Sequence, residues 1–359
     1  MNSKFKDSNI KGEGKKMKEI TQEIKKYSPH ENFFLPEPPL LRTPKTIQIL
    51  ILRQTHDYTI FRTEETREIN TVVIPKSSTD PLQTTRVAFL ASKQKAPESR
   101  FFTSLFKEYY LSYKNSLYSS ERDKTKDKKE QEKEENDDKS ILNCELKDSL
   151  CKMCPRCVLF GALRVESQDR WSIKHRIEYS TAFSLEPYQL VAESLTFNAI
   201  IESTNSTGRA LNIVENIDPV VSFPSIITLN SPTVEEFILI IKTLLGCKSY
   251  GAEGRIKGDM INYITGIVFG NEELLTSLEY CLELSSRNTI NDYSQETKSI
   301  LDKYKEFSSF PDRLKILDTN DTENLIEYIR KINLTDIIGS AVEKSKNFAD
   351  SATKASSKS

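Results

Sequence analysis

Apolar and polar positions along the chain follow two periods, and these periods predict most of its elements. The runs TIQILILRQ, YTIFRTEE, TVVIP and INYITGIVFG are rich in β-branched and aromatic residues and predict strands. The segment WSIKHRIEYSTAFSL alternates apolar and polar residues from Trp171 onward, which predicts a long strand or hairpin arm, with QLVAESLTFNAIIEST as its partner. Apolar residues at helical spacing predict helices in SRFFTSLFKEYYLSYKNSLYSS and TVEEFILIIKTLLGC. Strands and helices mix without a regular βαβ rhythm, so we expect an α+β fold with an antiparallel sheet.

Three polar stretches contrast with these core-forming segments. Residues 1–28 are Lys-rich and residues 341–359 end in SATKASSKS, so both are predicted to be flexible, with residues 29–340 forming the core and its insertions. In residues 121–139, 16 of 19 positions are charged. Burial cannot offset the ordering entropy of such a stretch, which predicts a disordered insertion. A functional lysine patch is the alternative, although the interleaved acids would cancel its charge.

Composition narrows the class of protein only slightly. A chain of 359 residues allows one large domain with insertions or two domains. Its 51 Lys and Arg nearly balance its 52 Asp and Glu, so a surface that binds nucleic acid must be a local patch. We find no apolar run of transmembrane length and no secretory signal, and we therefore expect a cytoplasmic protein. In that compartment clustered cysteines favour metal or redox chemistry over structural disulfides.

Four of the six cysteines, Cys144, Cys151, Cys154 and Cys157, fall in one short stretch. Four thiols suit a tetrahedral zinc ion, and a metal would stabilise a charged segment that has no core of its own, so residues 141–170 are predicted to be a zinc-binding insertion. The CxxCxxC run with a fourth cysteine can also hold an iron–sulfur cluster, although that cysteine lies upstream here. A redox CxxC pair and plain buried cysteines are further alternatives. A site closed by four thiolates leaves no position for substrate, so we expect a structural role.

Five stretches, in one order, resemble a known family. They are FRTEETREIN, VAFLASKQKAPESRFF, CPRCVLFGALR, WSIKHRIEYSTAFSLEPY and GCKSYGAEGRIKGDM, and they span roughly residues 58–260. Together they resemble the crRNA-binding backbone subunit of type I-D CRISPR interference complexes, a member of the RAMP superfamily. The resemblance implies an RRM-like (ferredoxin-like) core with helical and zinc-binding insertions. It also implies a non-catalytic subunit that assembles head to tail along a guide RNA, together with the large subunit, the crRNA 5′-end subunit and target DNA.

The basic residues inside these stretches are the candidate RNA-binding residues, because lysine and arginine hold the RNA backbone. They are Arg67, Lys93, Lys95, Arg100, Arg164, Lys174, Arg176, Arg255 and Lys257. The segment ASKQKAPES predicts a loop that offers two lysines to a phosphate. In GAEGRIKG, the glycines would let the backbone approach a phosphate closely. Arg67 and Arg100 could instead pair with neighbouring glutamates.

An enzyme is the main alternative to a binding module, namely a metal-dependent ribonuclease related to type III backbone subunits. Asp218 and Asp259 are its candidate residues, but neither stands in the carboxylate cluster that two-metal chemistry needs. The His56–Asp57 pair lacks the further histidines of a nuclease site, and the strand pattern predicts His175 to be a core histidine. A zinc-ribbon protein of the ribosome or transcription machinery would leave most of the chain unexplained. The sequence therefore favours a non-catalytic guide-RNA scaffold.

Overall fold

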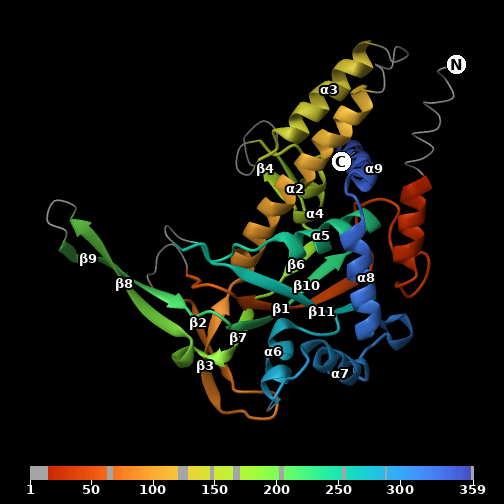
Figure 1. Cartoon of the computed structure of the whole chain (residues 1–359). Helices are drawn as coiled ribbons and strands as arrows, with labels where there is room; N and C mark the ends of the chain where they lie inside the picture. Colours follow the sequence, from red (N-terminus) through yellow and green to blue (C-terminus); the bar gives the residue numbers. More distant parts are fainter. Residues whose placement is uncertain are drawn as a thin grey trace.

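A sheet with helices on both faces forms the body of the protein, and a two-stranded hairpin projects from it (Figure 1). This computed structural model describes residues 15–62, 68–119, 128–145, 149–164, 170–201, 206–252, 256–287 and 289–356. The strands are β1 (Thr46–Thr55), β2 (Thr71–Pro75), β3 (Gln83–Phe89), β4 (Ala162–Arg164), β5 (Trp171–Ile173), β6 (Ile177–Tyr179), β7 (Ala182–Pro187), β8 (Ala192–Ile201), β9 (Ser206–Ile217), β10 (Ser222–Asn230), β11 (Met260–Gly270) and β12 (Lys315–Ile316). The helices are α2 (Ala91–Ser119), α3 (Lys128–Leu142), α4 (Pro155–Phe160), α5 (Val234–Gly246), α6 (Ser277–Ser285), α7 (Tyr293–Lys305), α8 (Thr319–Lys331) and α9 (Thr335–Ser356), with a further helix over residues 15–25.

The central five-stranded sheet has the order β12-β11-β1-β10-β6, and its pairs are antiparallel. Along the chain, the elements β1, α2, β6, β10, α5 and β11 occur in this order, with other elements inserted between them. In the sheet, the four strands among them are arranged in the order β11-β1-β10-β6. This is the β-α-β-β-α-β arrangement of ferredoxin-like and RRM-like domains. The α+β fold with an RRM-like antiparallel core, predicted from the sequence, is confirmed.

Both faces of the central sheet are covered. Ile47, Ile49 and Ile51 of β1 join one hydrophobic cluster with the helix over residues 15–25, α2, α4, α5, α8 and α9. Leu50 points to the other face and packs with Ile226, α6 and α7. The continuous burial of β1 follows from this double cover, because a strand with only one buried face would alternate. The middle of this sheet is therefore not accessible to a ligand.

Both ends of the described chain pack onto the body. Residues 15–25 form a helix that buries Ile20 and Ile24, and α9 buries Val342 and Phe348. The predicted flexibility of residues 1–28 and 341–359 is therefore wrong for these parts, since sparse apolar residues at helical spacing suffice to dock a polar helix. Residues 1–14 and 357–359 lie outside the described residues.

The charged stretch after α2 is also more ordered than predicted. Residues 128–142 form α3, which lies beside α2 (Figure 1). Asp138 of α3 accepts a hydrogen bond from the Tyr110 hydroxyl at 2.6 Å and binds the ammonium groups of Lys114 at 2.7 Å and Lys346 at 3.2 Å. The predicted disorder of residues 121–139 is wrong for 128–139, because these contacts offset the entropy lost when the helix is ordered. Residues 120–127 lie outside the described range.

Two further elements differ from the sequence prediction. ASKQKAPES is not a loop but forms the first turns of α2. WSIKHRIEYSTAFSL is divided into β5, β6 and β7, which pair with β4, β10 and β3, whereas β8 pairs with β9 to form the projecting hairpin. The long strand is interrupted between β5 and β6, where Arg176 turns into the interior instead of lying on a polar face.

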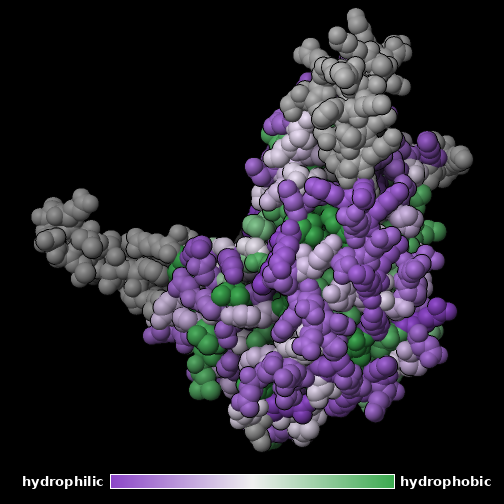
Figure 2. All heavy atoms as spheres, turned by 45° about the vertical axis from the view of Figure 1, so that its right-hand side comes forward, coloured by the Kyte–Doolittle hydropathy of each residue, from purple (hydrophilic) through white to green (hydrophobic). Residues whose placement is uncertain are grey.

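The surface shown in Figure 2 is mostly hydrophilic, with hydrophobic residues in small separate areas. Among the described residues, no helix combines the length and the apolar character that crossing a bilayer requires.

Candidate metal centre and nucleic-acid interface

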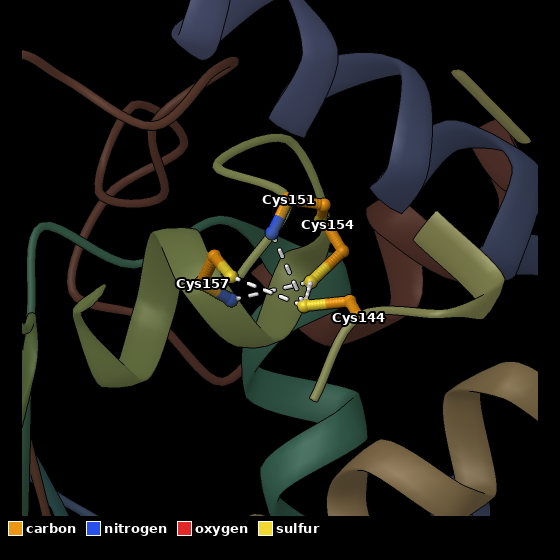
Figure 3. Close-up of side chains that lie close together, drawn as sticks. All are labelled: Cys144, Cys151, Cys154 and Cys157. Atoms are coloured by element: carbon orange, nitrogen blue, oxygen red, sulfur yellow. Dashed lines mark hydrogen bonds between the residues drawn. The ribbon is translucent and has the colours of Figure 1, made fainter. Parts of the chain in front are cut away.

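The four clustered cysteines converge on one point in the interior (Figure 3). Cys144 follows α3, Cys151 and Cys154 precede α4, and Cys157 lies in the first turn of α4. All four are buried, and their sulfur atoms lie within 4.8 Å of one another. The Cys144 Sγ is 3.5 Å from the Cys157 Sγ and 3.8 Å from the Cys154 Sγ.

The local backbone fixes the directions of these thiols. Cys154 is the N-cap residue of α4, and its Sγ accepts a hydrogen bond from the Cys157 backbone N–H at 3.4 Å. Pro155 occupies the first helical position, where its fixed φ favours helix initiation. The Cys151 N–H donates to the Cys144 Sγ, also at 3.4 Å. Backbone N–H donors of this kind stabilise thiolates, the form of cysteine that binds metals.

The spacing of the donors fits one tetrahedral ion. Sulfur atoms that surround a zinc ion at about 2.3 Å lie about 3.8 Å from one another, close to the separations seen here. An iron–sulfur cluster contains several iron atoms and bridging sulfides, so it needs more widely spaced thiols. All six cysteines are free, so no disulfide occupies the site. Among the described residues, no other group of three or more His, Cys, Asp or Glu side chains is close enough together to hold a metal ion.

Burial and hydrogen bonding act on the thiols in opposite directions. Burial raises the pKa of the Cys154 thiol, while hydrogen bonds from Cys151, Cys154 and Cys157 lower the pKa of the Cys144 thiol. Four thiolates at such close range repel one another, so they need a cation between them. The arrangement can hold a metal ion but leaves it no open position for catalysis, which agrees with a structural role.

Five basic side chains from four separate segments lie close enough to act on one another electrostatically, and we call them the basic cluster. They are Arg42, Lys95, Arg156, Lys174 and His175. Arg42 precedes β1, Lys95 lies in α2, Arg156 lies in α4, and the last two lie between β5 and β6. The Arg42 guanidinium donates a hydrogen bond to the His175 carbonyl oxygen and so links the first segment to the last.

Positive charge in the basic cluster exceeds negative charge. Burial, followed by the charge of Arg156, lowers the pKa of Lys95. Burial, followed by the charge of Lys95, lowers the pKa of His175, and other nearby cations act in the same direction. Glu178 is the carboxylate that opposes both shifts, and it already binds Arg42 at 2.5 Å. Cations held together against their repulsion favour a bound anion, and a phosphate supplies one.

The candidate RNA-binding residues predicted from the sequence do not all belong to this cluster. Lys95 and Lys174 do, and Lys174 is exposed. Lys93 is half-buried in the first turns of α2, Arg100 is exposed farther along this helix, and half-buried Arg164 ends β4. Exposed Lys257 pairs with Asp259 at 2.7 Å. Arg67 and Arg255 lie outside the described residues.

The structure contradicts the prediction that Arg176 binds RNA. Its side chain is 3% exposed, and its guanidinium donates to both carboxylate oxygens of Glu236, one of them at 2.9 Å. Glu236 also completes the capping box with Thr233 at the start of α5. Arg176 therefore anchors α5 to the interior, and we remove it from the candidate RNA-binding residues.

Sequence reasoning missed Arg42 and Arg156. Arg156 lies between two candidate metal ligands in CPRC, residues 154–157. This was a usable signal, because the position of a residue between two metal ligands is fixed by the metal site. Arg42 gave no such signal, because its partners lie more than a hundred residues away along the chain. His175, predicted to be a core histidine, is half-buried at the basic cluster.

The residues proposed for a ribonuclease do not form a recognisable metal site. Asp259 pairs with Lys257, and Asp218 is half-buried, with burial and the charge of Glu193 raising its pKa. His56 is exposed. Within the described ranges, neither aspartate joins a group of three possible metal ligands.

The model of the Csc2 CRISPR family matches residues 33–322, and the chain belongs to this family. The resemblance to type I-D backbone subunits predicted from the sequence is thus confirmed.

One solved structure agrees with this assignment at the level of the fold, and two others are similar to a lower degree. The crystal structure of Thermofilum pendens Csc2 is similar over 91% of this chain and 98% of that one, with a TM-score of 0.58 and 17% identity. A chain of a pre-nicking CRISPR RNA-guided surveillance complex matches over 73% of this chain and 86% of its own length, with a TM-score of 0.45 and 11% identity. Another surveillance-complex chain matches over 73% and 83%, with a TM-score of 0.38 and 10% identity. No curated protein sequence matches the chain.

Proposed function

We propose that the chain is the crRNA-binding backbone subunit of a cytoplasmic type I-D CRISPR effector complex and acts in antiviral DNA interference. Membership of the Csc2 family supports the class of complex. The observation that supports RNA binding is the basic cluster, in which burial and then neighbouring cations lower the pKa values of Lys95 and His175. In the proposed assembly, copies of the chain line up head to tail along the guide, with the large subunit, the crRNA 5′-end subunit and target DNA as further partners.

The proposed contacts go to phosphates and sugars rather than to base edges. A guide scaffold must accept any spacer sequence and must leave the bases free to pair with target. Lys95 and Lys174 of the basic cluster suit this task, because lysine recognises the charge of the RNA backbone without reading sequence. The covered sheet supports the same conclusion, since the face on which RRM domains stack bases is packed here against helices.

We also infer that Cys144, Cys151, Cys154 and Cys157 hold a structural Zn²⁺ ion. The sulfur separations and the all-thiolate donor set support zinc. The ion would stabilise the loop before α4 and the first turn of α4, and it would take no part in a reaction.

The direct test measures RNA affinity at several salt concentrations. The double variant Lys95→Gln/Lys174→Gln should bind more weakly to two RNAs of equal length and unrelated sequence, and by the same factor for both. Each lost phosphate contact should flatten the slope of log affinity against log salt by about 0.7. Lys331→Gln, which removes an exposed lysine of α8, is the matched control and should leave both quantities unchanged.

Two results would contradict the proposal. One is a strong preference of the unmodified chain for one of the two RNA sequences. The other is no binding to either RNA. The same samples are incubated with Mg²⁺ or Mn²⁺, and we expect the RNA to stay intact. Cleavage that Asp259→Ala abolishes would support the ribonuclease alternative instead.

RNA affinity should also depend on pH through His175. Burial and the charges of Lys95, Arg42 and Lys174 hold the pKa of His175 below its ordinary value of 6.5 in the free protein, against the opposing charge of Glu178. A bound phosphate would offset these cations and raise the pKa. Binding then takes up a proton, so affinity should rise as the pH falls through and below 6.5. In His175→Gln this rise should be absent, and an identical profile in both proteins would contradict the placement of phosphate beside His175.

A further inference from the structure

Helix α4 connects the metal centre to the basic cluster through Arg156. This residue lies between two of the four converging cysteines, Cys154 and Cys157. Its Nε is 3.3 Å from the Ser99 Oγ in α2, and its Nη1 donates to the Gly161 carbonyl oxygen at 3.1 Å. Only 7% of Arg156 is exposed, so its side chain braces α4 against α2 from the inside.

The end of α4 also fixes the strand segment that carries Lys174 and His175. Gly161 has a φ of +83°, and a Cβ at this position would come within 2.9 Å of the His175 backbone nitrogen and of the Ile173 carbonyl oxygen. The Arg176 N–H donates to the Leu159 carbonyl oxygen at 2.8 Å. Backbone atoms of α4 and of residues 173–176 are therefore in direct contact, with no side chain between them to absorb a shift.

These contacts join both halves of the basic cluster to the same short helix. On one side, Arg156 bonds α2, the helix that contributes Lys95. On the other side, Gly161 and Leu159 contact the segment that contributes Lys174 and His175. A movement of the first turn of α4 would change the separation between these two halves.

We propose that Arg156 is a positioning residue, which transmits the geometry of the four-cysteine site to the RNA-binding surface. This inference rests on the proposed RNA binding by the basic cluster. With the cysteines held around a metal ion, the first turn of α4 is fixed, and Arg156 then holds Lys95 and Lys174 at one spacing for successive RNA contacts. Metal loss weakens RNA binding by this route, although no cysteine touches RNA.

A double-mutant cycle separates positioning from a direct contact and from general damage to the fold. Arg156→Ala should weaken RNA binding by about tenfold in the otherwise unmodified chain. In the Lys95→Gln/Lys174→Gln background the same change should have almost no effect, because the residues it positions are already gone. Arg156→Lys should restore part of the affinity, since one ammonium group can reach one of the two oxygen partners. Metal content, measured in every variant, should stay at one ion per chain.

Ser99→Ala keeps the test decisive if Arg156→Ala does not fold. It removes one oxygen partner of Arg156 and should give a smaller loss of affinity with the same non-additivity. Ser104→Ala, on the exposed side of α2, is the matched control and should bind as the unmodified chain does. Chelation of the metal should likewise weaken RNA binding in the unmodified chain and far less in the double lysine variant.

The outcomes distinguish this inference from the proposed function. Normal RNA affinity in both Arg156→Ala and Ser99→Ala would overturn positioning and leave the scaffold function intact. Equal losses in the two backgrounds would also overturn it, because they would show an effect independent of Lys95 and Lys174. Failure of the unmodified chain to bind RNA would instead remove the proposed function itself.

Discussion

Replacing Cys154 with Ser is expected to abolish metal binding and to lower the free energy of unfolding by more than about 5 kcal/mol, since structural zinc sites contribute about 10 kcal/mol or more of apparent binding free energy. The effect should extend beyond the insertion. Cys154 belongs to the same hydrophobic cluster as Phe102 and Phe160, whose ring centroids are 5.2 Å apart, and as Ile49 of the central sheet. Elemental analysis and thermal unfolding measure the two effects, and we expect the melting temperature to fall by more than about 10 °C.

Cys281→Ser is the matched control for this experiment. Cys281 is also fully buried, but it lies in α6, and its Sγ is near the carbonyl oxygens of Phe183 and Ser184 rather than other thiols. The variant should keep its metal and lose only about 1–2 kcal/mol, the usual range for a small change in a core. Iron instead of zinc in the unmodified chain, or equal melting temperatures in the two variants, would contradict the proposed zinc site.

Local patterns predicted the elements that depend mainly on local sequence. The apolar run of β1, the helical spacing of α5 and the cysteine spacing around α4 each act over a few residues, and all three are found in the structure. Periodicity failed where a contact distant in sequence decides the conformation. Arg176 looks like a polar-face residue until Glu236 is placed beside it, and that partner is 60 residues away.

The ends of the chain failed as predictions for a related reason. A polar helix with two buried isoleucines, Ile20 and Ile24, resembles a flexible arm in composition. The hydrophobic cluster that the two isoleucines join includes residues of α5, α8 and α9, which lie far away along the chain, so nothing in the helix itself reveals that it docks. The same holds for Asp138, whose three partners come from two other helices.

The sequence predicted that basic residues form the candidate RNA surface, but it did not predict which basic residues lie together there. Family motifs led to Lys95 and Lys174, which lie in matched stretches far apart in sequence. Their association with Arg42 and Arg156 depends on the packing of α4 between α2 and the segment after β5, which no periodic pattern encodes. A charge cluster assembled from four segments has no signature within any one of them.

The second large effect is expected at a buried ion pair between β1 and α2. Arg53 is fully buried, and its Nη1 is 2.6 Å from Glu98 Oε1. Asn262 accepts from the same nitrogen at 3.0 Å, and Ser225 accepts from Nε at 2.8 Å. The hydroxyl of Tyr250 donates to Glu98 at 2.6 Å. The network therefore connects β1, β10, β11 and the segment between α5 and β11 to α2.

Burial and the nearby Glu98 carboxylate raise the pKa values of Tyr179 and Tyr250, so both phenols stay protonated and donate to that carboxylate. Glu98 therefore accepts hydrogen bonds from three side chains, Arg53, Tyr179 and Tyr250, and its replacement would remove the acceptor of all three. Substitution at this carboxylate should affect the fold more than substitution at any single donor, because it leaves a buried guanidinium without a counter-charge.

Glu98→Ala should therefore lower the free energy of unfolding by about 3–5 kcal/mol, the cost of leaving one buried charge unpaired. Replacing both partners, in Arg53→Met/Glu98→Leu, should be much less harmful than the single change, because an apolar pair of similar size carries no charge to desolvate. Lys298→Ala, which breaks a more exposed i,i+4 pair with Asp302, should cost only about 0.5 kcal/mol. Chemical denaturation of the three variants measures these differences. If the double replacement were as destabilising as Glu98→Ala, packing and hydrogen bonds rather than the unpaired charge would account for the loss, and the electrostatic explanation would be wrong.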